Sequence, residues 1–349
     1  MRLTAFFHPL ARIATVTMLA ALTLAGCGST TPARPDAGTQ PALSSSAPPV
    51  RIGIALGGGA AKGFAHIGVI KMLEANGFAP AVVSGTSAGS VVGALYASGM
   101  NAFEMQEKAV ALDEAKIRDL QLSSGGLVLG QKLEDYVNEQ VRRKPLEQMA
   151  KPFVVVATRL EDGERTVFAR GNTGQAVRAS SSVPGVFQPV TIGKYHFVDG
   201  GIVSPVPVDA ARQLGADIVI AVDISNKARG QTPGDMLGTL GQSIAIMGQK
   251  VGQAELARAD VIIRPQVLDI GSADFSQRTN AILEGEKAAL AVMPQLRERV
   301  AKLQAERAQA VRQAQQKAAE AEHKACLENR SRLQKLAGTV GLDGSCERP

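Results

Sequence analysis

The stretch Gly85-Thr86-Ser87-Ala88-Gly89 decides the fold, because it joins the apolar run Ala81–Ser84 to the helical pattern Ala88–Ser98. Small residues on both sides of Ser87 permit a tight turn from strand to helix, and such a turn exposes the serine hydroxyl at the positive end of the helix. The arrangement is typical of a nucleophile elbow. We therefore predict that Ser87 is a catalytic nucleophile; a glycine and serine turn without chemistry is the alternative.

Short apolar segments alternate with helical patterns on both sides of this motif. The expected strands are Arg51–Leu56, Ala81–Ser84, Phe153–Thr158, Tyr195–Val198, Asp217–Asp223 and Val261–Arg264, and the expected helices include Gly63–Asn76, Ala88–Ser98 and Val208–Leu214. Strands and helices that alternate at such intervals favour a mainly parallel sheet covered on both faces. The sequence therefore predicts an α/β fold with three layers, α/β/α.

A second glycine-rich stretch follows the first expected strand. Gly57, Gly58 and Gly59 are consecutive, and Lys62 and Gly63 come shortly after them. Such a run lets consecutive backbone N–H groups turn toward one point, as an oxyanion hole requires. A phosphate loop is the rival interpretation, but the lysine stands before the last glycine with no Ser or Thr after it. A dinucleotide site would need an acidic residue after the second strand, and none is there.

Asp199 is the best candidate for the base. It ends the apolar segment Tyr195–Val198 and is followed by Gly200 and Gly201, which leave room for a substrate. A carboxylate hydrogen-bonded to Ser87 could accept its proton directly. Asp223 also ends an expected strand and is the second candidate, but no glycine adjoins it.

No histidine completes a triad in the chain order of α/β-hydrolases, where the histidine follows the acid. His8 lies in the leader, and His323 lies in a charged helical tail. We expect His66 to be a helix residue near the glycine loop and His196 to be a strand residue, with neither acting in catalysis.

The N-terminus has the pattern of an exported protein. The apolar run Ile13–Ala25 follows Arg2 and Arg12 and is too short to span a bilayer, so residues 1–26 are expected to be a signal peptide. Leu24-Ala25-Gly26-Cys27 resembles the lipobox of bacterial lipoproteins, which implies a lipid on Cys27. Residues 27–49 are rich in Ser, Thr, Pro, Ala and Gly and are expected to be a flexible tether. Gly28 in place of an Asp favours the outer membrane over the inner membrane.

Composition excludes several kinds of partner. A formal net charge of +6, an aromatic content of 4% and the absence of Trp argue against nucleic acid binding. No cluster of Cys and His has metal-ligand spacing, so we expect no metal site.

Residues 291–349 are expected to form a helical tail, either a surface helix or one helix of a coiled coil. Cys326 and Cys346 could form a disulfide in an exported protein or remain as two thiols.

The glycine-rich loop, Gly-x-Ser-x-Gly and Asp-Gly-Gly, in this order and without a triad histidine, resemble the patatin-like phospholipase family. The segment Ala179–Phe187 is similar to one that bacterial members carry between the serine and the aspartate. The resemblance covers residues 50–290 and implies a patatin-like fold and a dyad of Ser87 and Asp199. It also implies backbone donors around Gly58 and Gly59 with Lys62 beside them. It further implies hydrolysis of phospholipid or lysophospholipid acyl esters without a cofactor.

Two alternatives remain open from the sequence. A lipoprotein with an old hydrolase fold could bind lipid or a protein without catalysis. An active enzyme could instead act on a small soluble ester or thioester.

Overall fold

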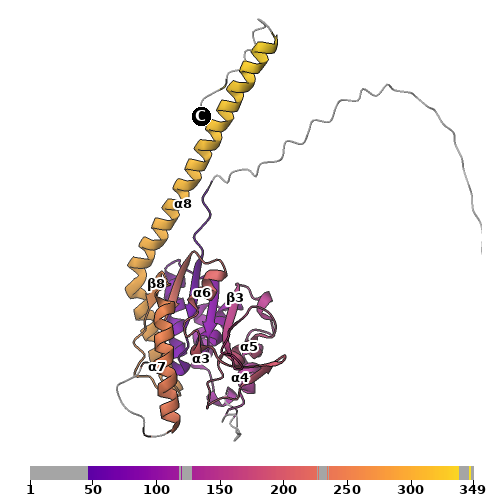
Figure 1. The fold of residues 1–349 in the computed structure, drawn as a ribbon. Helices are drawn as coiled ribbons and strands as arrows, with labels where there is room; N and C mark the ends of the chain where they lie inside the picture. The colour runs from indigo at the N-terminus through magenta and orange to yellow at the C-terminus, as the bar shows by residue number, and fades with distance from the viewer. Residues whose placement is uncertain are drawn as a thin grey trace, which may run out of the picture. The chain divides into compact units, whose positions relative to one another are not determined.

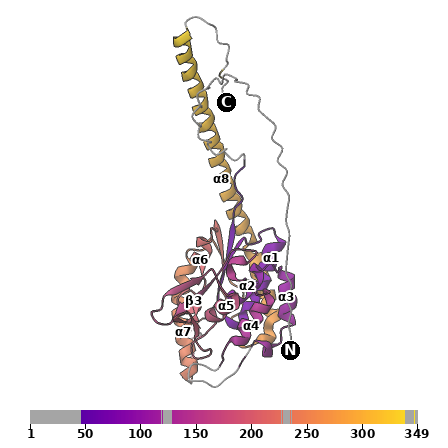
Figure 2. The same ribbon diagram turned by 90° about the vertical axis from the view of Figure 1, so that its right-hand side faces the viewer.

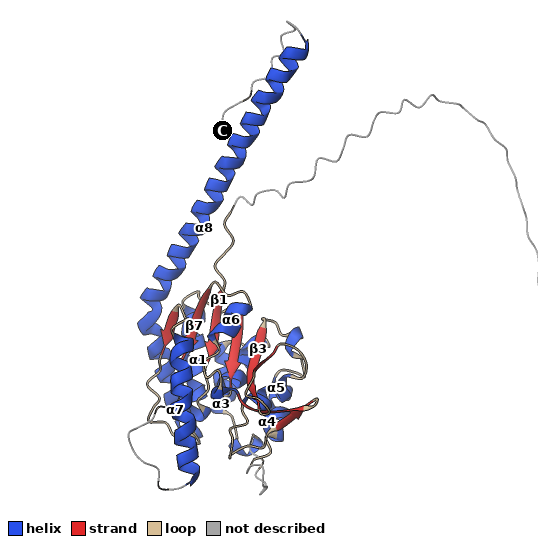
Figure 3. Ribbon diagram, in the orientation of Figure 1, coloured by secondary structure: helices blue, strands red, loops and turns tan. Residues whose placement is uncertain are grey.

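The computed structural model describes residues 46–117, 119, 128–225, 227, 234, 236–337 and 346. The predicted signal peptide, Cys27 and most of the predicted tether lie outside these residues. Within them the fold is built on a β-sheet with helices packed around it (Figures 1 and 3). The sheet has eight strands in the order β5-β6-β3-β2-β1-β7-β8, and β4 also pairs with β3. The strands are β1 Ile52–Leu56, β2 Val82–Thr86, β3 Phe153–Arg159, β4 Arg165–Phe168, β5 Val190–Ile192, β6 Tyr195–Asp199, β7 Ile218–Val222 and β8 Val261–Ile263.

The centre of the sheet is parallel, as the sequence predicts. The neighbours β3, β2, β1, β7 and β8 all run in one direction, whereas β4 and β6 pair antiparallel to β3, and β5 pairs antiparallel to β6. Every residue of β1, β2 and β7 is buried. Strands covered on both faces read as continuous apolar runs, which explains why these segments could be recognised from sequence.

Helices cover both faces of the sheet. They are α1 Ala65–Ala75, α2 Ala88–Ala97, α3 Ala102–Val110, α4 Gln131–Gln140, α5 Thr173–Ser180, α6 Val208–Gln213, α7 Met236–Leu256 and α8 Arg278–Ala337. On β1, Ile54 and Leu56 pack in one core with residues of α1, α2, α3 and α8, whereas Ala55 packs in a second core with residues of α6 and Leu256 of α7. Figure 2 shows α6 and α7 on one side of the sheet and α1, α2 and α3 on the other. The predicted three-layer α/β/α fold is confirmed.

The first part of α8 belongs to this packed core. A Cβ atom on Gly68 of α1 would lie 1.9 Å from the carbonyl oxygen of Ile282, and one on Gly285 would lie 2.0 Å from that of Ala65. The two helices can approach this closely only because these positions lack side chains. Leu296 is fully buried, and beyond it most described side chains of α8 are partly or fully exposed.

The far end of α8 carries a disulfide bond between Cys326 and Cys346. The structure thus selects the disulfide over two free thiols. Within the described residues, none of the helices combines the length and the hydropathy needed to cross a membrane.

Candidate active site

The predicted elbow is present at the end of β2. Ser87 follows Thr86, adopts φ 53° and ψ −126°, and is followed at once by α2. A positive φ is strained for a serine, and strain of this kind is typical of a nucleophile elbow. The flanking glycines are required by space, since a Cβ on Gly85 would lie 2.6 Å from the Gly89 carbonyl oxygen and one on Gly89 would lie 2.1 Å from that of Leu56.

Asp199 ends β6, which pairs with β3 on the side opposite to β2. It lies at nearly the same position along β3 as Thr86, the residue before Ser87. In β3, Val156 pairs with Thr86 of β2, and the next residue, Ala157, pairs with Asp199 of β6. This register explains how two residues far apart in the chain come together. Gly200 must be a glycine, because a Cβ there would lie 2.1 Å from the Val156 carbonyl oxygen.

The Asp199 carboxyl group is buried and only partly bonded. Its Oδ1 atom accepts a hydrogen bond from the Gly201 N–H at 2.7 Å, while Oδ2 has no partner of regular distance and angle among the described residues. Burial raises the pKa of Asp199 to about 6, and hydrogen bonding from the Ser87 side chain and the Gly201 N–H opposes this rise. The Ser87 side chain therefore interacts with the Asp199 carboxyl group, but no hydrogen bond of regular geometry joins them among the described residues. Catalytic hydrogen bonds are often loose before substrate binds.

The C-terminal end of α5 holds both residues. The Ser87 N–H donates to the Ser180 hydroxyl at 2.8 Å, and this hydroxyl donates to the Val156 carbonyl at 2.5 Å. The Asp199 N–H donates to the carbonyl of Ser182 at 2.9 Å. From the sequence, residues 180–182 are indicated as part of the site only by the family resemblance. Their neighbours in the chain do not indicate what the serine hydroxyl groups bind.

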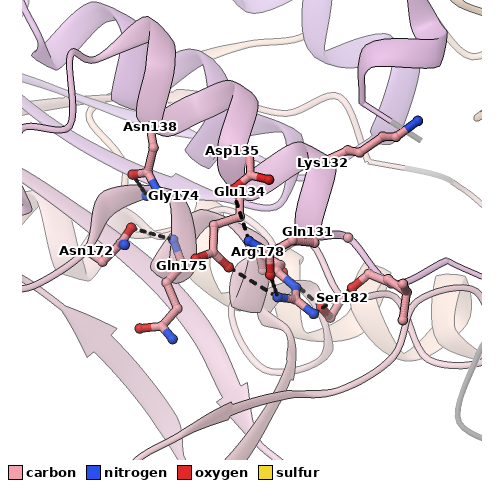
Figure 4. A network of polar contacts seen from close by, with 12 residues as sticks. Gln131, Lys132, Glu134, Asp135, Asn138, Asn172, Gly174, Gln175, Arg178 and Ser182 are labelled. Atoms are coloured by element: carbon pink, nitrogen blue, oxygen red, sulfur yellow. Dashed lines mark hydrogen bonds and ion pairs between the residues drawn. The ribbon is translucent and has the colours of Figure 1, made fainter. Parts of the chain in front are cut away.

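Helix α5 is fixed in turn by polar contacts with α4, shown in Figure 4. Arg178 donates to the Gln131 side chain at 2.7 Å, to Glu134 at 3.2 Å and to the Leu129 carbonyl at 2.7 Å. At the start of α5, the Gly174 N–H donates to the Asn138 side chain at 2.9 Å. Both ends of the helix are thus bonded, so the serines at its end keep a defined position.

The glycine loop lies against Ser87, but its hydrogen bonds correct part of the oxyanion prediction. The Gly57 N–H donates to the Val222 carbonyl at 3.1 Å, and the Gly58 N–H donates to the Pro205 carbonyl at 3.0 Å. These two groups are therefore occupied and cannot serve as the predicted donors. The N–H of Gly59 has no hydrogen bond within the described residues, nor has that of Ala60.

Lys62 and Gly63, which follow the glycine run, are both buried. Lys62 is 1% exposed, and its N–H donates to the Gly59 carbonyl at 3.2 Å. Gly63 packs against the residue after the serine, since a Cβ on it would lie 2.7 Å from the Ala88 Cβ. The short η1 turn, Ala60–Phe64, therefore packs directly on the elbow.

The other candidate bases have partners of their own. His66 is fully buried, its Nε2 atom donates to the Gly57 carbonyl at 2.8 Å, and burial lowers its pKa to about 4, so the ring is neutral at pH 7. His196 pairs with Glu161 at 2.8 Å. The Asp223 carboxylate accepts from Ser225 at 2.5 Å and from Arg264 at 3.3 Å. These contacts leave Asp199 as the carboxylate beside Ser87.

Ser87 and Asp199 line a mainly apolar cavity of about 690 Å³, which Gly59 and Ala60 also line. Its apolar walls include Ile67, Val91, Leu95, Tyr136, Val183 and Phe187. A cavity of this size and lining suits an apolar ligand with one polar reacting group. The described residues hold no group of His, Cys, Asp or Glu side chains arranged for a metal ion.

Comparisons with known proteins show which proteins the central part of this chain resembles. Residues 54–212 match the family model described as patatin-like phospholipase. An uncharacterized NTE family protein of Mycobacterium tuberculosis is 35% identical over 182 residues, which are 52% of this chain and 51% of the relative. Human patatin-like phospholipase domain-containing protein 6 is 32% identical over 184 residues, 50% of this chain and 13% of the relative.

The chain thus spans about half the length of the mycobacterial relative and a smaller share of the human one. Among solved structures, VipD from Legionella pneumophila has a TM-score of 0.50 at 16% identity, covering 71% of this chain and 68% of VipD. At that identity the likeness concerns the fold alone.

Proposed function

Because the chain carries a patatin-like phospholipase domain, we propose that it is a serine hydrolase that cleaves acyl esters of phospholipids or lysophospholipids. One observation carries the proposal. Ser87, whose backbone is strained, lies beside the buried carboxyl group of Asp199 at an apolar cavity that Gly59 also lines. Among the described residues, neither the Asp199 Oδ2 atom nor the Gly59 N–H has a regular hydrogen-bond partner. An acyl chain fits such a cavity, and an ester carbonyl would lie at the reacting groups.

The proposed reaction has two steps. The Ser87 Oγ atom attacks the acyl carbon while Asp199 accepts the hydroxyl proton at Oδ2. The oxyanion is stabilised by the N–H groups of Gly59 and Ala60, and the alcohol leaves with the proton from Asp199. Asp199 then removes a proton from water, which attacks the acyl carbon. As the bond to Ser87 Oγ breaks, Asp199 returns this proton to Ser87 Oγ, and the fatty acid is released. No cofactor takes part in this sequence.

A pKa of about 6 suits Asp199 for this role. The carboxylate is largely ionised at pH 7, yet it is a stronger base than an ordinary aspartate.

We also propose that a lipid on Cys27 and a tether over residues 27–49 hold the enzyme at a membrane. The outer membrane is favoured over the inner membrane. The support is the lipobox-like sequence before Cys27 and the composition of the residues after it. Replacing Cys27→Ser is expected to move the protein from the membrane fraction to the soluble fraction. Mass spectrometry of the N-terminal peptide checks for the lipid directly.

Lipid mass spectrometry tests the activity. Phospholipid and lysophospholipid mixtures are incubated with the wild type, Ser87→Ala, Asp199→Asn and, as a matched control, Asp223→Asn. We expect the first two variants to lose fatty acid release by at least about 10³-fold and the control to keep it.

Two outcomes would contradict the proposal. A wild type that releases no fatty acid and whose Ser87 is not labelled by a fluorophosphonate would be a non-catalytic lipid-binding protein. A wild type that prefers short-chain soluble esters over long-chain ones would be an esterase of another substrate class.

A further inference from the structure

Glu255 is a buried carboxylate that the proposed reaction does not use. It lies near the end of α7, and the residue is 4% exposed. Its Oε1 atom accepts from the Ser204 hydroxyl at 2.5 Å, and its Oε2 atom accepts from the Val206 N–H at 2.9 Å. A buried carboxylate is tolerated only where hydrogen bonds of this kind satisfy it.

The turn that Glu255 binds, residues 204–206, connects three parts of the active site. The Pro205 carbonyl accepts the hydrogen bond from the Gly58 N–H at 3.0 Å, beside the proposed oxyanion donors. The Ser204 carbonyl accepts from the Thr86 hydroxyl at 2.8 Å, one residue before the nucleophile. The Ser204 N–H donates to the Gly200 carbonyl at 2.8 Å, one residue after Asp199.

Helix α7 packs closely on this turn and on the residues after Asp199. A Cβ on Gly252 would lie 3.2 Å from the Pro205 side chain, and one on Gly248 would lie 3.5 Å from the Gly201 carbonyl oxygen. The small residues of α7 let the helix approach, and Glu255 then forms the polar contact. The turn is thus fixed from outside by a helix that contributes no reacting group.

We propose that Glu255 is a positioning residue that fixes the 204–206 turn, so that the Pro205 carbonyl holds Gly58 and directs the N–H groups of Gly59 and Ala60 toward Ser87. The inference rests on the proposed function for its kinetic consequence, but its structural consequence can be measured separately. A displacement of about 1 Å at an oxyanion donor is enough to lower a rate by about 10²-fold.

Three variants separate positioning from simple packing. Glu255→Gln keeps both contacts, because the amide oxygen can accept from Val206 and the amide nitrogen can donate to Ser204. Glu255→Ala removes both contacts, and Ser204→Ala removes one of them. Asp209→Ala is the matched control, since the Asp209 carboxylate binds Arg258 near the same end of α7 at 2.7 Å and has no hydrogen bond to the turn among the described residues.

The first measurement is kcat and KM on a soluble short-chain ester. We expect Glu255→Ala to lower kcat by about 10- to 100-fold with KM within about twofold, and Ser204→Ala to lie between it and the wild type. Glu255→Gln and Asp209→Ala are expected to stay within about threefold of the wild type. Loss in Glu255→Gln as great as in Glu255→Ala, or unchanged kcat in a folded Glu255→Ala protein, would overturn the proposal.

The second measurement is hydrogen exchange of the peptide containing residues 57–63, which needs no turnover. Faster exchange there in Glu255→Ala and Ser204→Ala, but not in Asp209→Ala, is the expected result, and equal exchange in all of them would contradict the inference. If the wild type hydrolyses no ester, the proposed function fails, and this exchange result still decides the role of Glu255. If Glu255→Ala does not fold, Ser204→Ala supplies the test.

Discussion

The Ser180 hydroxyl accepts a hydrogen bond from the Ser87 N–H at 2.8 Å and donates one to the Val156 carbonyl at 2.5 Å. Ser87 is held at a φ of 53°, which costs a serine about 1 to 3 kcal/mol. The bond to Ser180 offsets part of this cost, because it satisfies a buried N–H group that the turn directs away from the helix. The end of α5 is therefore part of the elbow.

Replacing Ser180→Ala should destabilise the protein. The Ser87 N–H and the Val156 carbonyl would both lose a buried partner, so we expect the free energy of unfolding to fall by about 1 to 3 kcal/mol. Ser181→Ala is the matched control, because the Ser181 hydroxyl is buried without a partner among the described residues. Urea denaturation measures both variants, and an equal effect of the two would contradict the role assigned to Ser180.

The raised pKa of Asp199 predicts the pH dependence of the reaction. The base must be ionised to accept the Ser87 proton, so kcat/KM should rise with pH through about 6 and level off above it. An aspartate with its ordinary pKa would already have reached the plateau near pH 5. The measurement is kcat/KM on an uncharged ester from about pH 4.5 to about pH 8. A profile that stays flat down to about pH 5 would rule out this base.

The same carboxyl group should lower stability at neutral pH. Its folded pKa of about 6 lies above the ordinary 3.8, so the folded state favours the protonated form. The stability linked to Asp199 is therefore fully present below about pH 4 and is lost as the pH rises through about 6.

Asp199→Asn removes this penalty and keeps an oxygen for the Gly201 N–H. We expect the variant to be more stable than the wild type by up to about 3 kcal/mol at pH 8, with the difference shrinking toward pH 4. Thermal unfolding at several pH values measures it. Asp223→Asn, which loses a contact with Arg264, should show no such gain. Equal stability of Asp199→Asn and the wild type at pH 8 would mean that burial does not raise the pKa of Asp199.

Some features were predictable because the chemistry is local in sequence. The elbow needs small residues on both sides of one serine, and the central strands are continuous apolar runs, so both can be recognised from adjacent residues. The sequence does not indicate the strands β4 and β5. They are short, and all four residues of β4 are half-buried, which leaves no distinct apolar pattern.

Other features depend on residues far apart in the chain. The glycine run predicts an oxyanion loop, but only the fold reveals that Val222 and Pro205 occupy two of its N–H groups. Helix α7 was not predicted, because its several glycines disfavour a helix until packing against Pro205 and Gly201 compensates for them. No sequence pattern identifies Glu255 as a site residue, since its partners Ser204 and Val206 lie about 50 residues earlier in the chain.

Two glycine substitutions should have opposite effects on stability. In Gly89→Ala, the new methyl group would lie 2.1 Å from the Leu56 carbonyl oxygen, a backbone atom that cannot move without shifting β1. We expect this variant to lose at least about 3 kcal/mol of stability, or to fail to fold, and to lose fluorophosphonate labelling of Ser87.

Gly241→Ala is the matched control, because a Cβ atom added to Gly241 of α7 would have no described atom within 4 Å. Alanine favours a helix over glycine by about 1 kcal/mol, so this variant should be slightly more stable than the wild type and keep its labelling. Normal labelling and stability in Gly89→Ala would show that the elbow is not packed against β1 as described.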